Sequence, residues 1–391
     1  MPDIICNSSR KCHATARKRN LTMNEVVASN WNDNDLLLMA LFSAVTTAML
    51  IWLLSPVARY FQLVDKPDSR KQHTGVVPLV GGLAITLSAV VTILVTGGLS
   101  NPSTITLLSV GTILCLLGML DDYSEISPRY RLIVQIAVGL ALCFVADLKI
   151  VSVGDLNGNG LVAFGAITSV VFTIMCSVGV FNSINMIDGI DGLAGVIVGL
   201  SAAALASIAF HAGDNYSSSV LIVVLASLAG FLAFNLGVFG RARKVFMGDA
   251  GSLFLGFILL WFFIHLSQSD NAPMSPVVAG WIFGLPLADT ISVIVGRICR
   301  GQHPLSAGRD HIHHRLLNHG LSSRDTLFIL GSYHAVLVVI GVLCNGSSSL
   351  DVVLFWGFIV LTITHFFVLK VFLPHKPLAS DGVLPRPSAR I

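Results

Sequence analysis

Polar side chains recur at a fixed spacing between two long apolar runs of this sequence. The segment 179–195 reads GVFNSINMIDGIDGLAG and holds Asn182, Asn185, Asp188 and Asp191, each three residues from the next. On a helix this spacing predicts that all four side chains lie on roughly one face. A carboxylate at the edge of a bilayer is costly unless it meets a metal, a cation or water. This segment is therefore predicted to bind a charged partner.

Two further acidic segments have the same character. The adjacent Asp121 and Asp122 directly follow an apolar run in LLGMLDDYSEISPRYR, where acids would oppose the dipole of a helix that ends there. Asp249 stands in KVFMGDAGS just before an apolar run, either as a helix cap or at a helix end that binds anions. Carboxylate oxygens of this kind suit Mg²⁺ or Mn²⁺. Arg131 follows the first pair and could hold a phosphate.

A cluster of nitrogen donors lies further along the chain, in SAGRDHIHHRLLNHG. It consists of Arg309, His311, His313, His314 and Arg315. The histidine spacing does not give the i, i+4 pair of an H-E-x-x-H zinc helix, and the seven cysteines form no C-x-x-C pair. The pattern therefore favours a binding site for a diphosphate over a zinc site, and no disulfide framework is expected.

These segments must be positioned by membrane helices. Hydrophobic residues make up 54% of the 391 residues and charged residues only 12%, against about 25% charged in average soluble chains. A transmembrane helix needs about 20 mostly apolar residues. We predict an all-α integral membrane protein of about eleven such helices: Leu36–Leu54, Val76–Thr96, Thr104–Leu120, Leu132–Ala146, Leu161–Phe181, Leu193–Phe210, Val220–Phe239, Leu253–Leu266, Val277–Val295, Leu327–Leu343 and Val352–Leu373.

The distribution of Lys and Arg predicts the orientation of these helices. The odd-numbered loops hold 4, 2, 0, 3 and 5 Lys or Arg residues, whereas the even-numbered loops hold only Lys149. By the positive-inside rule the odd loops and the C-terminus face the cytoplasm. All the polar segments above fall in odd loops, so they are expected together at the cytoplasmic face of the membrane.

The organisation along the chain follows from the same pattern. A polytopic membrane domain is expected over residues 23–373, with a cytoplasmic tail over residues 374–391. Residues 1–22 carry five Lys or Arg that would lie outside, against the rule. We interpret them as an extension that precedes the native start at Met23; a genuine basic arm or a miscounted helix are the alternatives.

The motifs resemble those of the polyprenyl-phosphate N-acetylhexosamine-1-phosphate transferases. LVDKPDSRKQHTGVVPLVGG, LDDYSEIS, NMIDGIDGLAG, KVFMGDAGS and RDHIHHRL stand in the order and spacing of that family. Ile312 interrupts the histidine run, which favours the branch that transfers GlcNAc-1-phosphate over the peptidoglycan branch with three consecutive histidines. The resemblance implies Mg²⁺-dependent transfer, with Mn²⁺ as an alternative, of GlcNAc-1-phosphate from UDP-GlcNAc to undecaprenyl phosphate, with release of UMP.

The resemblance also implies a role for each site residue. Asp121 and Asp122 would orient or deprotonate the lipid phosphate or share the metal, and Asp249 with Asn185 would hold the metal on the diphosphate. The remaining residues would bind substrate, with the acids on the nucleotide side and the cations on the diphosphate and sugar: Asp188, Asp191, Asn182, Arg131, Arg309, His311, His313, His314, Arg315 and Lys71. Partners are then the two substrates and membrane lipids and not nucleic acid; a homodimer is left open.

Three other readings and one buried acid complete the predictions. A transporter would show inverted repeats and broken helices near the midplane, and we find no clear repeat. A CDP-alcohol phosphotransferase would show D-G-x-x-A-R, but no Arg follows Asp188 and Gly189 at that spacing. The reaction could also use another UDP-N-acetylhexosamine. Asp289 lies about 9 Å inside the ninth helix, so we expect a structural hydrogen bond there; His265, His334 and His365 are expected to be packing residues.

Overall fold

The computed structural model describes residues 33–65, 75–98, 102–124, 126–269, 271–304, 308–346 and 348–374. Over these ranges the chain is helical apart from loops, a single bridge between Ser152 and Ala163, and one short antiparallel pair. In that pair β1 (Val64–Asp65) bonds to β2 (Val77–Pro78). The predicted extension over residues 1–22, Lys71 and nearly all of the predicted tail lie outside the described residues.

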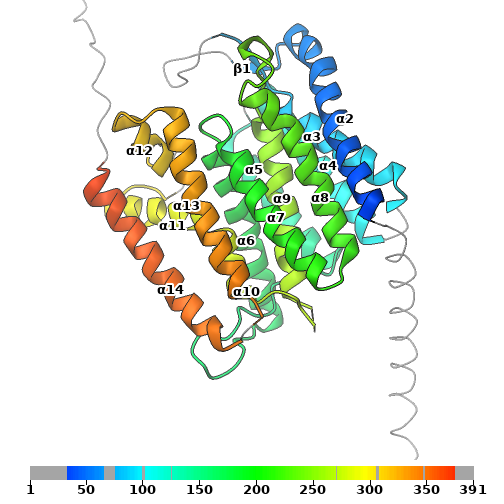
Figure 1. The fold of residues 1–391 in the computed structure, drawn as a ribbon. Helices are drawn as coiled ribbons and strands as arrows, with labels where there is room; N and C mark the ends of the chain where they lie inside the picture. Colours follow the sequence, from blue (N-terminus) through cyan, green and yellow to red (C-terminus); the bar gives the residue numbers. More distant parts are fainter. Residues whose placement is uncertain are drawn as a thin grey trace, which may run out of the picture.

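Long helices run side by side through the molecule (Figure 1). Polar loops separate them, as the sequence predicts. The helices are α2 (Asp33–Tyr60), α3 (Gly81–Val95), α4 (Pro102–Ser124), α5 (Pro128–Phe144), α6 (Ala166–Ile187), α7 (Leu193–His211), α8 (Asn215–Asn235), η2 (Arg241–Arg243), α9 (Gly248–Ser267), α10 (Pro276–Ile282), α11 (Gly284–Cys299), α12 (Ile312–Asn318), α13 (Ser323–Leu343), α14 (Ser348–Phe367) and the π-helical turn η3 (Val368–Phe372).

The all-α membrane architecture is confirmed. Among the described residues, eight helices are long and apolar enough to cross a membrane, or nine if α10 and α11 form one span. These two helices correspond to the single predicted segment 277–295, but they meet at an angle of 83°. Helices α3 and α5 also coincide with predicted segments, but they have only 15 and 17 residues. Eleven crossings therefore stay a prediction.

Helix α9 forms the centre of the bundle. Of its most apolar stretch, 94% is buried inside the protein, whereas the corresponding share is 22% for α2 and 17% for the last span. The sequence predicted a short segment here, Leu253–Leu266. The helix is longer, because it already begins at Gly248 and ends at Ser267. The helix that carries Asp249 is thus surrounded by protein, which fixes the position of this acid.

Small residues bring two neighbouring helices close to the start of α9. A Cβ atom added to Gly82 of α3 would lie 2.0 Å from the backbone nitrogen of Gly251, and one added to Gly118 of α4 would lie 2.4 Å from that of Ala250. Close backbone approach through small residues is a common way for membrane helices to pack. It places the C-terminal end of α4 directly against the first turn of α9.

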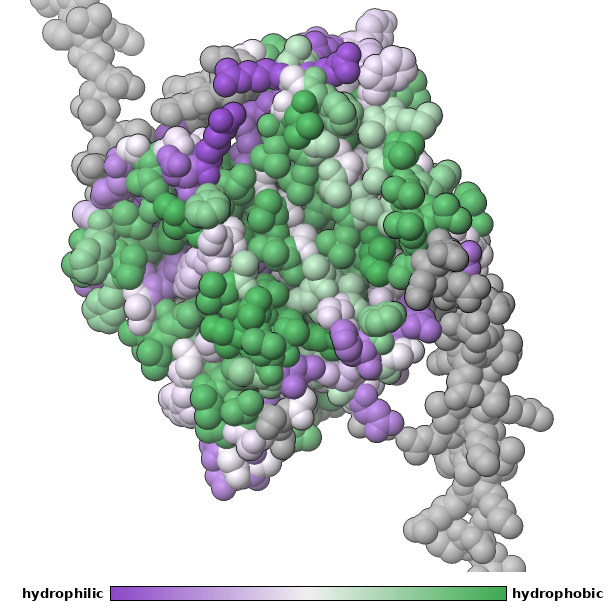
Figure 2. All heavy atoms as spheres, viewed as in Figure 1, coloured by the Kyte–Doolittle hydropathy of each residue, from purple (hydrophilic) through white to green (hydrophobic). Residues whose placement is uncertain are grey.

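The outer surface is suited to lipid. Figure 2 shows hydrophobic side chains over much of the viewed face, with hydrophilic side chains gathered at the end near β1 and in smaller groups at the opposite end. Individual apolar side chains are largely exposed on the outer helices, including Trp52 at 68% and Ile167 at 81%. Contiguous exposed apolar surface of this extent is expected where the solvent is a bilayer.

Candidate active site

The adjacent acids at the end of α4 have different surroundings, which their neighbouring positions in the chain do not reveal. The carboxylate of Asp122 accepts hydrogen bonds from the backbone amides of Asp249, at 2.9 Å, and Ala250, at 3.3 Å. These amides belong to the first turn of α9, so Asp122 caps that helix and benefits from the positive end of its dipole. The carboxylate of Asp121 instead accepts from the amide of Ile126 at 2.8 Å and pairs with Arg131 at 2.9 Å.

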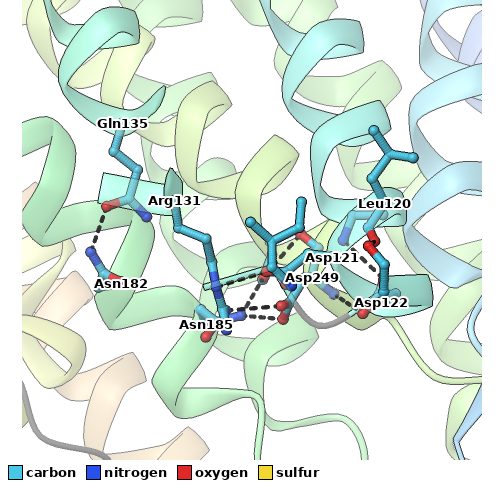
Figure 3. Close-up of polar contacts among 12 residues, drawn as sticks. Leu120, Asp121, Asp122, Arg131, Gln135, Asn182, Asn185 and Asp249 are labelled. Carbon is cyan, nitrogen blue, oxygen red and sulfur yellow. Dashed lines mark hydrogen bonds and ion pairs between the residues drawn. The ribbon is translucent and has the colours of Figure 1, made fainter. Parts of the chain in front are cut away.

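Asp249 is the acid on which the cluster converges (Figure 3). One carboxylate oxygen pairs with Arg131 of α5 at 3.1 Å, and the other accepts from the Asn185 amide of α6 at 2.5 Å. Asn185 also donates to the hydroxyl of Ser252 at 3.1 Å. The Asp249 side chain keeps 27% of its surface exposed, against 2% for Asp121. Asp249 and Arg131 are therefore the members of this cluster that can meet a ligand.

The NMIDGIDGLAG motif does not remain one helix face as predicted. Helix α6 ends at Ile187, so Asn182 and Asn185 lie on the helix, whereas Asp188 and Asp191 lie in the loop before α7. Helix α7 starts only after Gly192, whose left-handed conformation, with φ of 77°, turns the chain into that helix.

The polar residues of segment 179–195 therefore have different partners. Asn182 donates to Gln135 of α5 at 2.8 Å and so links two helices. Asp191 pairs with Lys244 at 2.5 Å. Burial, and then the charges of Asp249 and Asp191, raises the pKa of Asp188 to about 7. Asp188 is therefore protonated more readily near neutral pH than an ordinary aspartate.

The histidine loop reaches the same region from the other side. Its short helix α12 begins directly after His311, and His313 is fully buried. A Cβ atom on Gly189 would lie 2.1 Å from the Nε2 atom of His313, so this histidine packs against the NMIDGIDGLAG loop. The ring of His314 lies 4.1 Å from that of His313. The structure thus brings the predicted acids and the predicted histidines into one continuous region.

Burial keeps the two central histidines neutral. Desolvation, followed by the charge of the neighbouring His314, lowers the pKa of His313 to about 3. Desolvation and the charge of Arg309 lower the pKa of His314 to about 4. A neutral imidazole has one donor and one acceptor, and both ring nitrogens of His313 lack a hydrogen-bond partner among the described residues.

The guanidinium of Arg315, which we predicted to bind the diphosphate, bonds to the protein backbone instead. Its guanidinium is buried and donates to the backbone carbonyls of Asp310, Leu369 and Leu373, at 2.6, 2.7 and 2.9 Å. These bonds join the histidine loop to the end of the last helix, which indicates a role in positioning the loop. Arg309 is only partly exposed and remains the arginine of this loop that suits direct contact with a phosphate.

One residue that supports the histidine loop was not predicted. Arg297 of α11 is only 2% exposed, and its guanidinium pairs with Asp310 at 3.0 Å and donates to the carbonyl of Pro304 at 3.1 Å. In the sequence Arg297 counts only as one more cytoplasmic positive charge. Its position one helix earlier than the loop that it holds could not be read from spacing.

The donor set fits a hard divalent cation held jointly with substrate. Over the part of the chain that the structure describes, no three His, Cys, Asp or Glu side chains form a ready-made metal site. Mg²⁺ is commonly bound through one or two carboxylates together with substrate phosphates. Asp249, the partly exposed acid, and the amide oxygen of Asn185 supply oxygen ligands of this kind.

Comparisons with known proteins agree with this geometry. Residues 104–267 match the family described as glycosyl transferase family 4. The undecaprenyl-phosphate alpha-N-acetylglucosaminyl 1-phosphate transferase of Escherichia coli K12 is 33% identical over 325 residues, which cover 82% of this chain and 86% of that protein. The chain belongs to the polyprenyl-phosphate N-acetylhexosamine-1-phosphate transferases.

Two more members of this transferase family show a similar relationship. The enzyme of the same name from Yersinia pestis is 35% identical over 287 residues, covering 73% of this chain and 78% of that protein. The Haemophilus influenzae enzyme is 31% identical over 307 residues, covering 78% and 86%. The match to glycosyl transferase family 4 spans Asp121, Asp122, the NMIDGIDGLAG segment and Asp249 but ends before the histidine loop, which therefore lies outside that match.

Proposed function

We propose that the protein transfers GlcNAc-1-phosphate from UDP-GlcNAc to undecaprenyl phosphate. An oxygen of the lipid phosphate attacks the sugar-bearing phosphorus, the bond from that phosphorus to UMP breaks, and undecaprenyl diphosphate-GlcNAc forms. The observation that carries the proposal is the convergence of Asp121, Asp249 and Arg131 beside a histidine loop packed on Gly189. The names of the relatives supply the sugar and the lipid.

The chemistry asks the protein mainly to position two anions. A phosphate monoester has a second pKa near 6, so the lipid phosphate is already a nucleophile at neutral pH. Arg131 offers a partly exposed guanidinium to a phosphate oxygen, and Asp121 fixes the Nε side of that guanidinium from behind. Asp122 acts differently, because its bonds to the start of α9 hold Asp249 in place. Mg²⁺, held by Asp249 and Asn185, would neutralise charge on the diphosphate.

The location of this reaction is part of the proposal. The loops that carry the acids and the histidines face the cytoplasm of a bacterial inner membrane, where UDP-GlcNAc is available, and the product is the first lipid-linked intermediate of O-antigen or a related surface glycan. A single cysteine placed at His319, in a loop of this face, should react with an impermeant thiol reagent only after the membrane is opened. Labelling of intact spheroplasts would contradict this orientation.

Purified protein should move radiolabel from UDP-[³H]GlcNAc into an organic extract when undecaprenyl phosphate and Mg²⁺ are present. One UMP should be released for each sugar transferred, EDTA should stop the reaction, and Mg²⁺ or Mn²⁺ should restore it. A panel of other UDP-N-acetylhexosamines run in parallel tests the alternative donor. Full turnover in excess chelator would overturn the metal requirement, and no transfer from any UDP-sugar would overturn the reaction itself.

A further inference from the structure

Asp289 connects three elements beside the histidine loop. It lies on α11 with 2% of its surface exposed. One carboxylate oxygen is 2.7 Å from the Nδ1 atom of His311, and the other accepts from the backbone amide of Ile312 at 3.0 Å. The Nε2 atom of His365 on α14 lies 3.5 Å from that second oxygen. The expected structural hydrogen bond is thus present, and its partners His311 and Ile312 belong to the histidine loop.

A helix cap alone does not require this arrangement. The amide of Ile312 at the start of α12 could be satisfied by a neutral oxygen acceptor. A buried carboxylate is costly unless it is paired and hydrogen-bonded. Here the contact with the His311 ring and the hydrogen bond from the Ile312 amide offset the cost of burying the Asp289 carboxylate. The carboxylate therefore does something that a neutral cap would not do, which is to act on the imidazole.

The contact determines which nitrogen of His311 remains available. A carboxylate can only accept, so the Nδ1 atom of His311 must carry a hydrogen that it donates to Asp289. The Nε2 atom is then the nitrogen left to meet a ligand. The His311 ring is nearly parallel to that of His313, with centroids 6.3 Å apart, and His313 packs against Gly189 beside Asp188. His311 thus continues the row of side chains that leads to the acid cluster.

We infer that Asp289 is a positioning residue of the transferase site, which fixes the orientation and tautomer of His311 so that Nε2 faces the diphosphate of the nucleotide sugar. This inference rests on the proposed function. Pairs of this kind, in which a carboxylate orients a histidine, typically change activity by about 10–100-fold when the carboxylate is replaced. Asp289 does not contact the substrate; it acts through His311.

The test compares Asp289→Asn, His311→Gln and the double variant by the radiolabel assay in detergent. Asparagine keeps the size and the acceptor for the Ile312 amide, but its NH₂ group cannot accept from Nδ1. We expect kcat to fall about 10–100-fold in each single variant. The double variant should be no slower than His311→Gln, because both substitutions remove the same interaction.

Asp214→Asn is the matched control. Asp214 also caps a helix, α8, and also lies 3.5 Å from a histidine, His265, but it lies at the α7–α8 turn, away from the acid cluster. This variant should keep kcat within threefold of wild type. If Asp289→Asn does not fold, Asp289→Glu replaces it in the same cycle, because a longer side chain keeps the charge and shifts its position.

The possible outcomes separate the two proposals. Activity of Asp289→Asn within threefold of wild type, or losses that multiply in the double variant, would overturn the positioning role. An equal fall in thermal stability in Asp289→Asn and Asp214→Asn without a specific loss of kcat would also overturn it. Wild-type protein that transfers no sugar phosphate would instead refute the proposed function and would be seen before any variant is made.

Discussion

The acid cluster and the histidine loop lie next to each other but are built in opposite ways. In the acid cluster the ligand-facing side chains keep substantial exposure, with 27% for Asp249 and 34% for Arg131. In the histidine loop His311 keeps 5% of its surface exposed, its partner Asp289 on α11 keeps 3%, and the Arg315 guanidinium donates to backbone carbonyls. In a run of charged residues, some side chains can therefore be buried and serve as internal support, while others stay exposed enough to meet a ligand.

Replacing an acid of the exposed cluster should have the largest effect. Asp249→Asn removes the charge that pairs with Arg131 and is proposed to hold the cation. We expect kcat/KM to fall about 100-fold, in line with the roughly 3 kcal/mol of a charged interaction, with the protein still inserted in membranes. Asp147→Asn is the control, since Asp147 is 91% exposed and pairs only with Lys149. Equal activity of both variants would remove Asp249 from the site.

Arg315 and Arg309 should separate stability from substrate binding. Arg315→Ala leaves buried carbonyls without a donor, so the free energy of unfolding should fall by about 3 kcal/mol or more. Arg309→Ala should leave thermal unfolding in detergent unchanged and raise KM for UDP-GlcNAc about tenfold. If Arg315→Ala is as stable as wild type but loses affinity for UDP, the clamp predicted from the sequence is right and the positioning role is wrong.

Gly189 offers a way to disturb the contact between the two regions. Alanine there would place a methyl group 2.1 Å from His313 Nε2, and forced overpacking typically costs about 1–3 kcal/mol. Stability and activity should both fall in Gly189→Ala. The additional change His313→Ala removes the clash, so the double variant should lose less stability than the sum of the two single losses. Losses that simply add would show that the two loops do not press on each other.

The smallest effect concerns pH. Since the pKa of His313 is about 3 in the folded protein against 6.5 ordinarily, the unfolded chain takes up a proton as pH falls below 6.5 while the folded protein does not. Stability should therefore decline by about 1–2 kcal/mol from pH 6.5 to 5. Asp188, with a raised pKa, contributes with the opposite sign, so the measurement compares wild type with His313→Gln. Identical pH dependence of thermal unfolding in the two would contradict buried, neutral His313.

The sequence predicted the parts of this site that depend on residue type and missed those that depend on three-dimensional packing. Charges flanking apolar runs located the acids, and the structure brings Asp121, Asp249, Arg131 and Asn185 together. Hydropathy could not reveal that Asp122 points at the start of α9, because that contact joins residues 127 positions apart. Counts of positive charge likewise could not separate a buried Arg297 from a solvated one.

The prediction of the fold located the helices but missed one bend and one helix end, for similar reasons. Every predicted apolar segment coincides with one or more helices, because a bilayer demands satisfied backbone groups in each crossing. The 83° bend between α10 and α11 was missed, since both helices lie within one predicted apolar segment and composition carries no direction. The end of α6 at Ile187 was missed because spacing by three residues suits a helix, whereas the break between α6 and α7 depends on backbone angles that this spacing does not show.

The bond from Asp122 to the start of α9 has a consequence for how the protein is made. At a synthesis rate of about 5–20 residues per second, roughly 6–25 s separate the emergence of this acid from that of the amide it caps. During that interval the carboxylate waits at the bilayer edge, and the centre of the bundle is missing. The acid cluster can therefore be complete only once α9 packs against Gly82 and Gly118. A nascent chain halted before residue 248 would hold its membrane helices without a catalytic centre.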